Sequence, residues 1–345
     1  MLNSFIKKYN SFRKEKVMDN RLFNTQKKYA FIGVGMHSLS NIYPVLNHFN
    51  ITLKYICTQS GKQYQALKKQ FPDCIFNDSI NDIINDTEVK GVFVCSSPKS
   101  HFGILSKLAH AGKQIFIEKP PCQTFEELEN LLAIQNTNTC KIGFQRRYWP
   151  GNKYILKKIK SAKSYTYTFC FGSYPNGDPY TELFIHALDY CSFLFGAFNV
   201  LSFDRQEYDD GITLQIHAKH HNGISALIEL STHFSWNDPI DIMTINCSEE
   251  VITAQYPVSV KGKKRPARVM HLPTERIFKQ AEITKEYFST GNLVMPVNEM
   301  NTFVLQGFYK ELETFIFLVE NDVTPGVNDL KDLIPLYKAI KQLKQ

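Results

Sequence analysis

The sequence predicts an α/β protein in which a doubly wound parallel sheet is followed by an α/β domain built on an open, mostly antiparallel sheet. Between residues 28 and 143, short apolar runs alternate with amphipathic helical stretches, and strands that alternate with helices form parallel sheets. After Pro150, strands follow one another with few helices between them, which is typical of an antiparallel sheet. A chain of 345 residues is long enough for two such domains.

The first half of the sequence is predicted to alternate between strands and helices. We expect strands at 28–34, 52–58, 89–97, 113–120 and 140–145, and helices at 39–49, 61–71, 101–112 and 124–135. The run at 89–97 is almost wholly apolar, as in a strand that is buried on both faces. Thr124 and Glu127 have the spacing of a capping box, which predicts the start of the last helix.

The second half is predicted to be rich in strands. We expect them at 164–172, 199–206, 211–221, 224–235, 241–248 and 250–257. One early helix, at 181–196, interrupts the strands, and two late helices are expected at 301–320 and 329–343.

The charge of the chain does not indicate a nucleic acid or a membrane as partner. The formal net charge is +7 at pH 7, and basic residues are dense at the N-terminus, at Lys7, Lys8, Arg13, Lys14, Lys16 and Arg21. This segment lacks the apolar region of a secretory signal, so we expect a solvated extension, with a partner-binding arm as the alternative. No apolar run approaches the roughly 20 residues of a membrane-spanning helix, and no basic stripe is interleaved with aromatic residues as in nucleic-acid grooves.

The eight cysteines have no metal-ligand spacing. Several of them, such as Cys95 and Cys170, lie inside apolar runs, as buried free thiols do. We therefore expect free thiols, no bound metal and a reducing cytoplasm as the location.

Two glycines, Gly33 and Gly35, end the first apolar run. A dinucleotide-binding turn has a third small residue three positions later, so that the helix packs closely on the strand. Here that residue is Ser38, and the helix that follows would offer amide groups to a phosphate. The alternative is an ordinary strand-to-helix turn, so the rest of the chain has to decide.

The end of the second strand bears on the choice of cofactor. Domains specific for NAD place Asp or Glu there to hold the ribose hydroxyls, whereas this chain has Thr58, Ser60 and Lys62. Without a carboxylate a 2′-phosphate is tolerated, with Ser60 and Lys62 as donors. The loop therefore favours NADP slightly over NAD, and a turn that binds no cofactor is the alternative.

A Glu–Lys pair, Glu118 and Lys119, follows a later apolar strand and precedes two prolines. Ionisable groups that leave a buried strand towards a cleft are candidates for chemistry, because partial desolvation lowers the pKa of a lysine. The alternative is a surface ion pair at the end of a strand.

Five stretches carry a resemblance to a known family: "GVG", "SSPKSHF", "EKPPCQT", "GFQRRYWP" and "ELFIHALDYCSFLFG". In order and spacing they resemble the glucose–fructose oxidoreductase / inositol dehydrogenase / rhizopine catabolism (Gfo/Idh/MocA) family, over almost the whole chain from about Lys28. The resemblance implies an N-terminal Rossmann domain and a C-terminal sheet that packs against another subunit, as in a homodimer or homotetramer. It also implies hydride transfer between a nicotinamide and a secondary alcohol or ketone of a sugar, sugar derivative or cyclitol.

The resemblance also assigns roles to single residues. Lys119 matches the lysine that holds the substrate oxygen near the nicotinamide, and His186 matches the histidine that acts as general acid/base. Glu182 stands where many members have aspartate, and its spacing of four residues puts it on the same helix face as His186. The expected cofactor-binding set comprises Gly33, Gly35, Ser38, Thr58, Ser60, Lys62, Ser97, Pro98, His101, Glu118, Lys119 and Gln145.

These residue types suit the expected reaction. Hydride leaves a carbinol carbon only as the hydroxyl proton is removed, so a base must lie within hydrogen-bond reach. Histidine titrates near neutral pH, and a lysine cation stabilises the developing alkoxide. The alternative for His186 is a helix histidine packed against its apolar neighbours.

The expected organisation has four parts. Residues 1–26 form the basic extension, 27–146 the dinucleotide-binding domain, 147–328 the substrate and oligomerisation domain, and 329–345 a C-terminal helix that packs back on the dinucleotide domain. The competing functions are a non-catalytic NAD(P)-binding sensor or regulator and a partner subunit of another oxidoreductase. The presence of both Lys119 and His186 favours the enzyme.

Overall fold

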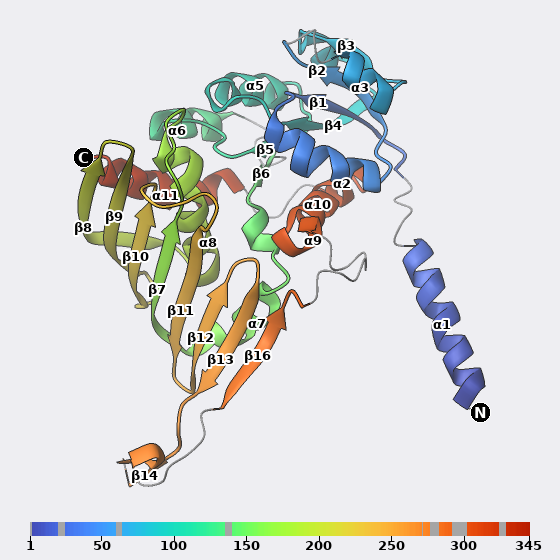
Figure 1. Cartoon of the computed structure of the whole chain (residues 1–345). Coiled ribbons are helices and arrows are strands. Elements are labelled where there is room, and N and C mark those ends of the chain that lie inside the picture. The colour runs from blue at the N-terminus through green and yellow to red at the C-terminus, as the bar shows by residue number, and fades with distance from the viewer. Residues whose placement is uncertain are drawn as a thin grey trace. The chain divides into compact units, whose positions relative to one another are not determined.

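The computed structural model describes residues 2–19, 25–59, 64–134, 140–270, 272–276, 283–291, 302–323 and 329–345 (Figure 1). The chain divides into two compact units. The first comprises residues 1–122, 129–143 and 311–330, and the second comprises residues 123–128, 144–310 and 331–345. Each unit is therefore assembled from segments that are far apart in the sequence.

The first unit contains a six-stranded parallel sheet. Its strands lie in the order β3-β2-β1-β4-β5-β6, and every neighbouring pair is parallel. The bounds are β1 (Lys28–Ile32), β2 (Leu53–Cys57), β3 (Ile75–Asn77), β4 (Val89–Val94), β5 (Gln114–Glu118) and β6 (Cys140–Gly143). The strand order reverses between β1 and β4, which is the switch point of a doubly wound sheet. The predicted parallel sheet is confirmed.

Helices occupy the connections of this sheet: η1 (Ser38–Ile42), α2 (Tyr43–His48), α3 (Tyr64–Gln70), α4 (Asn81–Asn85), α5 (Pro98–His110) and α6 (Phe125–Ala133). The predicted capping box at the start of α6 is confirmed. Thr124 Oγ1 accepts a hydrogen bond of 3.1 Å from Glu127 N, and the Glu127 carboxylate accepts one of 2.7 Å from Gln123 N. Two backbone donors at the start of the helix are satisfied in this way.

A helix from late in the chain, α10 (Phe308–Glu320), completes the first unit. The ring of Phe315 lies 5.1 Å from that of Phe93 on β4 and 5.8 Å from that of Phe116 on β5. Tyr29 on β1 donates a hydrogen bond of 2.7 Å to Glu320. Aromatic burial of this kind is a main source of stability, so α10 is part of the core of this unit.

Two elements of the first unit were not predicted. The N-terminal extension contains the helix α1 (Leu2–Asp19), and β3 is a strand of three residues at the edge of the sheet. An edge strand this short leaves almost no periodic pattern in the sequence. Among the helices of the described residues, none combines the length and the apolar character that crossing a membrane requires.

The second unit is built on an eight-stranded sheet in the order β16-β13-β12-β11-β7-β10-β9-β8. Only the β7–β10 pair is parallel, and the other described pairs are antiparallel. The bounds are β7 (Ala162–Cys170), β8 (Phe198–Tyr208), β9 (Gly211–His220), β10 (Ser225–Ser231), β11 (Ile240–Cys247), β12 (Glu250–Gln255), β13 (Ser259–Lys264) and β16 (Thr284–Ser289). The predicted open, mostly antiparallel sheet is confirmed.

Helices cover the inner face of this sheet. The π-helix η6 (Tyr180–Phe184) leads into α8 (Ile185–Phe195), whose Phe195 stacks on Tyr165 of β7 at 4.4 Å. Further helices are α7 (Asn152–Lys158) and α11 (Asp329–Leu343). Gln342 of α11 donates to the carbonyl of Val200 on β8, and residues 331–345 group with the second unit. The packing of residues 329–345 on the dinucleotide domain stays a prediction.

The single helix predicted at 301–320 is wrong. It is divided into α9 (Thr302–Gln306) and α10 by Gly307, which has φ = +96°. A Cβ at Gly307 would collide with the carbonyl oxygen of Gln145. The chain breaks the helix there because only glycine permits this conformation and this close approach.

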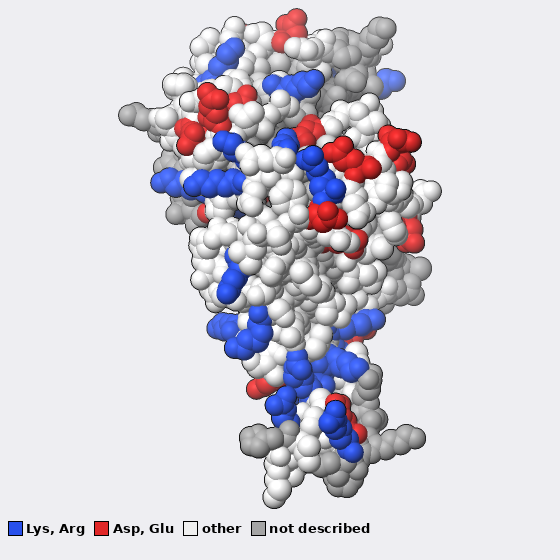
Figure 2. All heavy atoms as spheres, turned by 90° about the vertical axis from the view of Figure 1, so that its left-hand side faces the viewer, with Lys and Arg blue, Asp and Glu red and all other residues white. Residues whose placement is uncertain are grey.

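Positive charge gathers at one end of the second unit (Figure 2). A hollow of about 580 Å³ at this end is lined by Lys163, Arg265 and Arg268, with Glu249 as its acidic member. Arg265 donates to the carbonyl of Cys247 at 3.1 Å, so its side chain is held by the main chain. The positive charge of the chain is therefore not concentrated in the N-terminal segment alone.

Candidate functional site

The turn after β1 lies at the switch point of the parallel sheet. Gly33 has φ = +97°, and a Cβ there would lie 2.6 Å from the carbonyl group of Cys95 and from Cα of Ser96. Gly33 N donates to the carbonyl of Cys57 and Cys95 N donates to that of Ile32, both at 2.8 Å. The segments that leave β1 and β4 therefore touch through their backbones, and a side chain at position 33 would separate them.

Gly35 and Ser38 complete this turn. A Cβ at Gly35 would meet no atom within 4 Å, so one side of the backbone is open there. Ser38 Oγ accepts a hydrogen bond from Gly35 N and donates one to Gly35 O, both at 2.9 Å, and Ser38 is 1% exposed. Serine is small enough for the third position of the turn, and its hydroxyl closes the turn. The open side at Gly35 fits the approach of a dinucleotide phosphate.

The segment after β2 is described only in part. Thr58 is buried, its N–H donates to the carbonyl of Asn77 at 3.0 Å, and Tyr64 donates from its hydroxyl to the Thr58 carbonyl at 2.9 Å. Ser60 and Lys62, the expected donors to a 2′-phosphate, lie outside the described residues. The slight preference for NADP stays a prediction.

The segment after β4 begins α5, with Ser97 before its first turn and Pro98 as its first residue. His101 is 1% exposed, with Nδ1 2.7 Å from the carbonyl oxygen of Pro120 and Nε2 2.9 Å from that of Ser96. Burial lowers the pKa of His101. This histidine joins the segments that leave β4 and β5, and its contact with a cofactor stays a prediction.

The Glu–Lys pair stands at the end of β5. Glu118 is 6% exposed, and a Cβ at Gly143 of β6 would lie 3.0 Å from its carboxyl group. Burial acts to raise the pKa of Glu118, but His37 and Lys119 together hold it below its usual value. His37 Nε2 lies 3.1 Å from Glu118 Oε1. Lys119 is half-buried directly after the strand.

Sequence reasoning missed His37. It occupies an unspecified position of the glycine turn, so the motif gives no reason to single it out. Its contact with Glu118 joins two segments that are 81 residues apart in the chain.

Glu182 and His186 lie on the η6–α8 helix of the second unit. Between Tyr180 and Cys191 they are the only residues that are not buried. The Glu182 carboxylate accepts hydrogen bonds from the Tyr174 hydroxyl at 3.0 Å and from Asp178 N at 3.3 Å. The ring of His186 meets that of Phe144 edge to face, with 6.4 Å between centroids. The predicted pair therefore occupies the accessible part of an otherwise buried helix.

A buried charge network underlies Gln145, which begins the 3₁₀ turn η4 (Gln145–Tyr148). Arg146 pairs with Asp241 of β11, and Tyr167 donates a hydrogen bond of 2.9 Å to the same carboxylate. Arg147 Nε donates to Asp189 of α8 at 2.9 Å. These ion pairs fix η4 to the sheet and to the histidine helix. Sequence reasoning missed them because their members are 95 and 42 residues apart.

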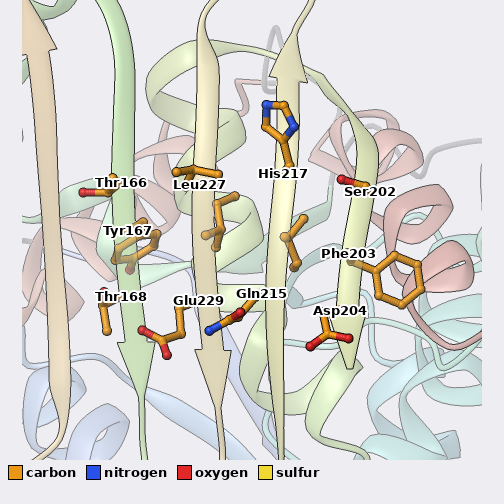
Figure 3. A pocket seen from close by; sticks show the side chains of 12 residues that line it. Thr166, Tyr167, Thr168, Ser202, Phe203, Asp204, Gln215, His217, Leu227 and Glu229 are labelled. Carbon is orange, nitrogen blue, oxygen red and sulfur yellow. The ribbon is translucent and has the colours of Figure 1, made fainter. Parts of the chain in front are cut away.

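The outer face of the second sheet carries a pocket of about 570 Å³ (Figure 3). Glu229 of β10 lies opposite Gln215 of β9, and Leu227 lies opposite His217. Thr168 of β7 is the neighbour of Glu229 on its other side. The pocket contains none of the predicted site residues, so it belongs to a different surface.

A parallel sheet in this order, with a glycine turn at its switch point, defines a dinucleotide-binding protein of the Rossmann type. Residues 27–145 match the model of an oxidoreductase family with an NAD-binding Rossmann fold, Gfo/Idh/MocA, and through these residues the chain belongs to that family.

Curated relatives match part of the chain. An uncharacterized oxidoreductase of Schizosaccharomyces pombe is 25% identical over 136 residues, which is 38% of this chain and 37% of that protein. The inositol 2-dehydrogenase of Paracoccus denitrificans is 30% identical over 91 residues, 26% of this chain and 27% of the enzyme. The chain thus aligns with well under half of the length of each of these relatives.

Solved structures match nearly the whole chain. A dehydrogenase from Chromobacterium violaceum has a TM-score of 0.77 at 16% identity, covering 93% of this chain and 95% of its own. A levoglucosan dehydrogenase in complex with NADH has a TM-score of 0.71 at 17% identity, covering 92% and 96%. These likenesses show that the fold of both units is shared.

Proposed function

We propose that the protein is an NAD(P)-dependent oxidoreductase. It transfers a hydride between the nicotinamide and a secondary alcohol or ketone of a sugar, sugar derivative or cyclitol. The observation that carries the proposal is the turn at the switch point, where Gly33 allows the backbones after β1 and β4 to touch and Gly35 leaves an open side. When bound, the nicotinamide supplies the hydride acceptor or donor.

Lys119 is assigned the role of holding the substrate oxygen. Its ammonium group would donate a hydrogen bond to the hydroxyl or carbonyl oxygen and stabilise negative charge that develops there. Its place directly after a buried strand, beside the anionic Glu118, fixes the start of the side chain.

His186 is assigned the role of general acid/base, with Glu182 as a positioning residue or a ligand of a substrate hydroxyl. An imidazole takes the hydroxyl proton as the alcohol is oxidised and returns it in the reverse direction. The two donors to Glu182, Tyr174 and Asp178 N, hold its carboxylate in a fixed place. The accessibility of Glu182 and His186 on a buried helix supports these roles.

The cofactor and substrate class rest partly on relatives. The levoglucosan dehydrogenase structure contains NADH, whereas Thr58, Ser60 and Lys62 give a slight preference for NADP here, because a carboxylate is absent from this loop. Inositol 2-dehydrogenase acts on a cyclitol and levoglucosan dehydrogenase on a sugar derivative, as their names state. We propose a polyhydroxylated substrate of this class.

We further propose a homo-oligomer that forms through the outer face of the second sheet. This face presents Leu227, which is 58% exposed, among polar side chains on β7, β9 and β10. A two-fold axis through such a face would bring the same residues of two copies together. Leu227→Glu should lower the mass measured by light scattering, and an unchanged mass would argue against this interface. Leu201→Glu, at another exposed leucine on β8, serves as the comparison.

The cytoplasm is proposed as the location. All eight cysteines are free thiols, which fits a reducing compartment.

The test of the function is a fluorescence titration of the full chain with NADH and NADPH, for wild type, Lys119→Ala and the exposed control Lys107→Ala. Binding of either nucleotide by wild type, followed by turnover with a polyol or keto-sugar that Lys119→Ala abolishes, is the expected result. Binding without turnover of any polyol would favour the non-catalytic sensor. No binding to folded protein would overturn the oxidoreductase proposal.

A further inference from the structure

His37 links the glycine turn to the Glu–Lys pair across the carboxyl edge of the parallel sheet. It follows β1, whereas Glu118 ends β5, and β4 lies between these two strands. The contact of 3.1 Å between Nε2 and Oε1 therefore spans the end of β4. Dinucleotides bind along this edge in doubly wound sheets, so the imidazole stands beside the expected path of the cofactor.

The two ends of this contact differ in burial. Glu118 is 6% exposed, whereas the His37 side chain is 46% exposed. Asn41 of the following helix lies 3.2 Å from the other ring nitrogen, Nδ1. The ring is thus held from both sides while about half of its surface remains open. The neighbouring Gly35 also has an open side, since no atom lies within 4 Å of its Cβ position.

The surroundings favour a positive charge on the imidazole. Glu118 is the acidic group in contact with it, and the pKa of this carboxyl lies below its usual value, so it is an anion at neutral pH. The other ionisable groups that face Glu118 are Lys119, His101 and Cys95. Burial lowers the pKa of His101 and raises that of Cys95, which leaves both groups neutral near pH 7.

We propose that His37 is a dinucleotide-binding residue that presents an imidazolium cation to the diphosphate, with Glu118 as the residue that positions it. The inference rests on the proposed function, because it requires a bound dinucleotide. A glycine turn ordinarily binds the diphosphate through backbone N–H groups and the helix N-terminus, whose charge does not change with pH. In this chain one ligand of the diphosphate is titratable in the range where histidine changes charge.

The consequence is an affinity for dinucleotide that falls as the pH rises. Below the range in which histidine titrates, a cation faces the diphosphate and makes a charge-assisted hydrogen bond. Above this range the imidazole is neutral and the bond is weaker. We expect the dissociation constant for NADH to rise about five- to tenfold between pH 6.0 and pH 8.5. NADH suits this measurement because it lacks the 2′-phosphate of NADPH, which titrates near pH 6.

The experiment compares the full-length wild type with His37→Gln, His37→Lys and the control His110→Gln at both pH values. His110 is exposed at the end of α5, away from the carboxyl edge of the sheet. Circular dichroism first establishes that each variant is folded. His37→Gln should bind equally weakly at both pH values, and His37→Lys equally tightly, because lysine stays charged throughout. His110→Gln should follow the wild type.

The outcomes separate this inference from the proposed function. If wild type and His37→Gln bind NADH with the same pH dependence, the role of His37 is wrong and the oxidoreductase proposal stands. If the wild type binds neither NADH nor, in a repeat of the titration, NADPH at either pH, both proposals fail. If only NADPH binds, its own titration is common to wild type and His37→Gln, and a difference between the two still reports on His37.

Discussion

The two units hold their candidate site residues by different means. In the first unit, the turn depends on backbone that approaches backbone, as at Gly33 and Cys95, and its residues follow the ends of strands. In the second unit, η4 and the histidine helix depend on ion pairs, Arg146 with Asp241 and Arg147 with Asp189. The first arrangement is specified by the absence of a side chain, and the second by two charges that must both be present.

This difference decides what a substitution should do in each unit. A side chain added at a glycine changes the turn locally, because the strands on either side are held by their own hydrogen bonds. Removal of one member of a buried ion pair leaves the other charge without compensation, which is costly wherever it occurs. The comparison therefore predicts local losses in the first unit and general losses in the second.

The largest expected effect is on turnover. Lys119→Ala and His186→Ala, one from each unit, should each lower kcat/KM by about 10²–10⁴-fold, because each removes a group that acts on the substrate oxygen or its proton. Lys107→Ala and His221→Ala, at exposed positions, are the matched controls. If the two residues act on one hydroxyl, the double variant should be little worse than the poorer single variant. Full activity in either single variant would contradict its role.

The next effect is on stability. Asp241→Ala should lower the free energy of unfolding by about 3–5 kcal/mol, because it leaves the buried Arg146 guanidinium without its carboxylate. Urea denaturation followed by tryptophan fluorescence measures this loss, since Trp149 lies in the same unit. Asp238→Ala, at an exposed position nearby in the sequence, should change the stability by less than about 0.5 kcal/mol. Equal stabilities of the two variants would remove the contrast between the units.

The glycine turn offers a pair of substitutions with opposite outcomes. Gly33→Ala forces a side chain into φ = +97° and against Cys95, and should cost about 1–3 kcal/mol of stability. Gly35→Ala meets no atom of the protein within 4 Å, so the stability should stay within about 0.5 kcal/mol while NADH or NADPH affinity falls. Thermal unfolding and nucleotide titration of both variants test this. Unchanged affinity in Gly35→Ala would place the diphosphate elsewhere.

The smallest expected effect concerns Glu118 and acid. Its folded-state pKa is held below the usual value by His37 and Lys119, so the carboxylate stabilises the fold above the ordinary pKa of glutamate. This contribution is lost as the pH falls through the lower, folded-state pKa. Glu118→Gln should therefore be less stable than wild type near pH 7, by about 0.5–1.5 kcal/mol, and the difference should shrink towards pH 4. A constant difference between urea midpoints at the two pH values would contradict this account.

The sequence predicted those parts of the fold that leave a local pattern. The capping box at Thr124, the parallel sheet and the glycine turn were all readable because their signals span only a few residues. The break at Gly307 was not readable, because its cause is the carbonyl of Gln145, 162 positions earlier in the chain. The same holds for His37 with Glu118 and for Arg146 with Asp241, whose pairing depends on the fold that brings them together.

The packing of α10 against β4 and β5 has a consequence for synthesis on the ribosome. Phe315 and Glu320 complete a unit whose first strand contains Tyr29. A nascent chain that has emerged as far as residue 310 therefore carries all six strands of that sheet while Phe93 and Phe116 lack their aromatic partner. The apolar patch has to remain unoccupied, or be shielded by a chaperone, until the second unit has been translated. The unit that the ribosome begins first is the one whose core closes last.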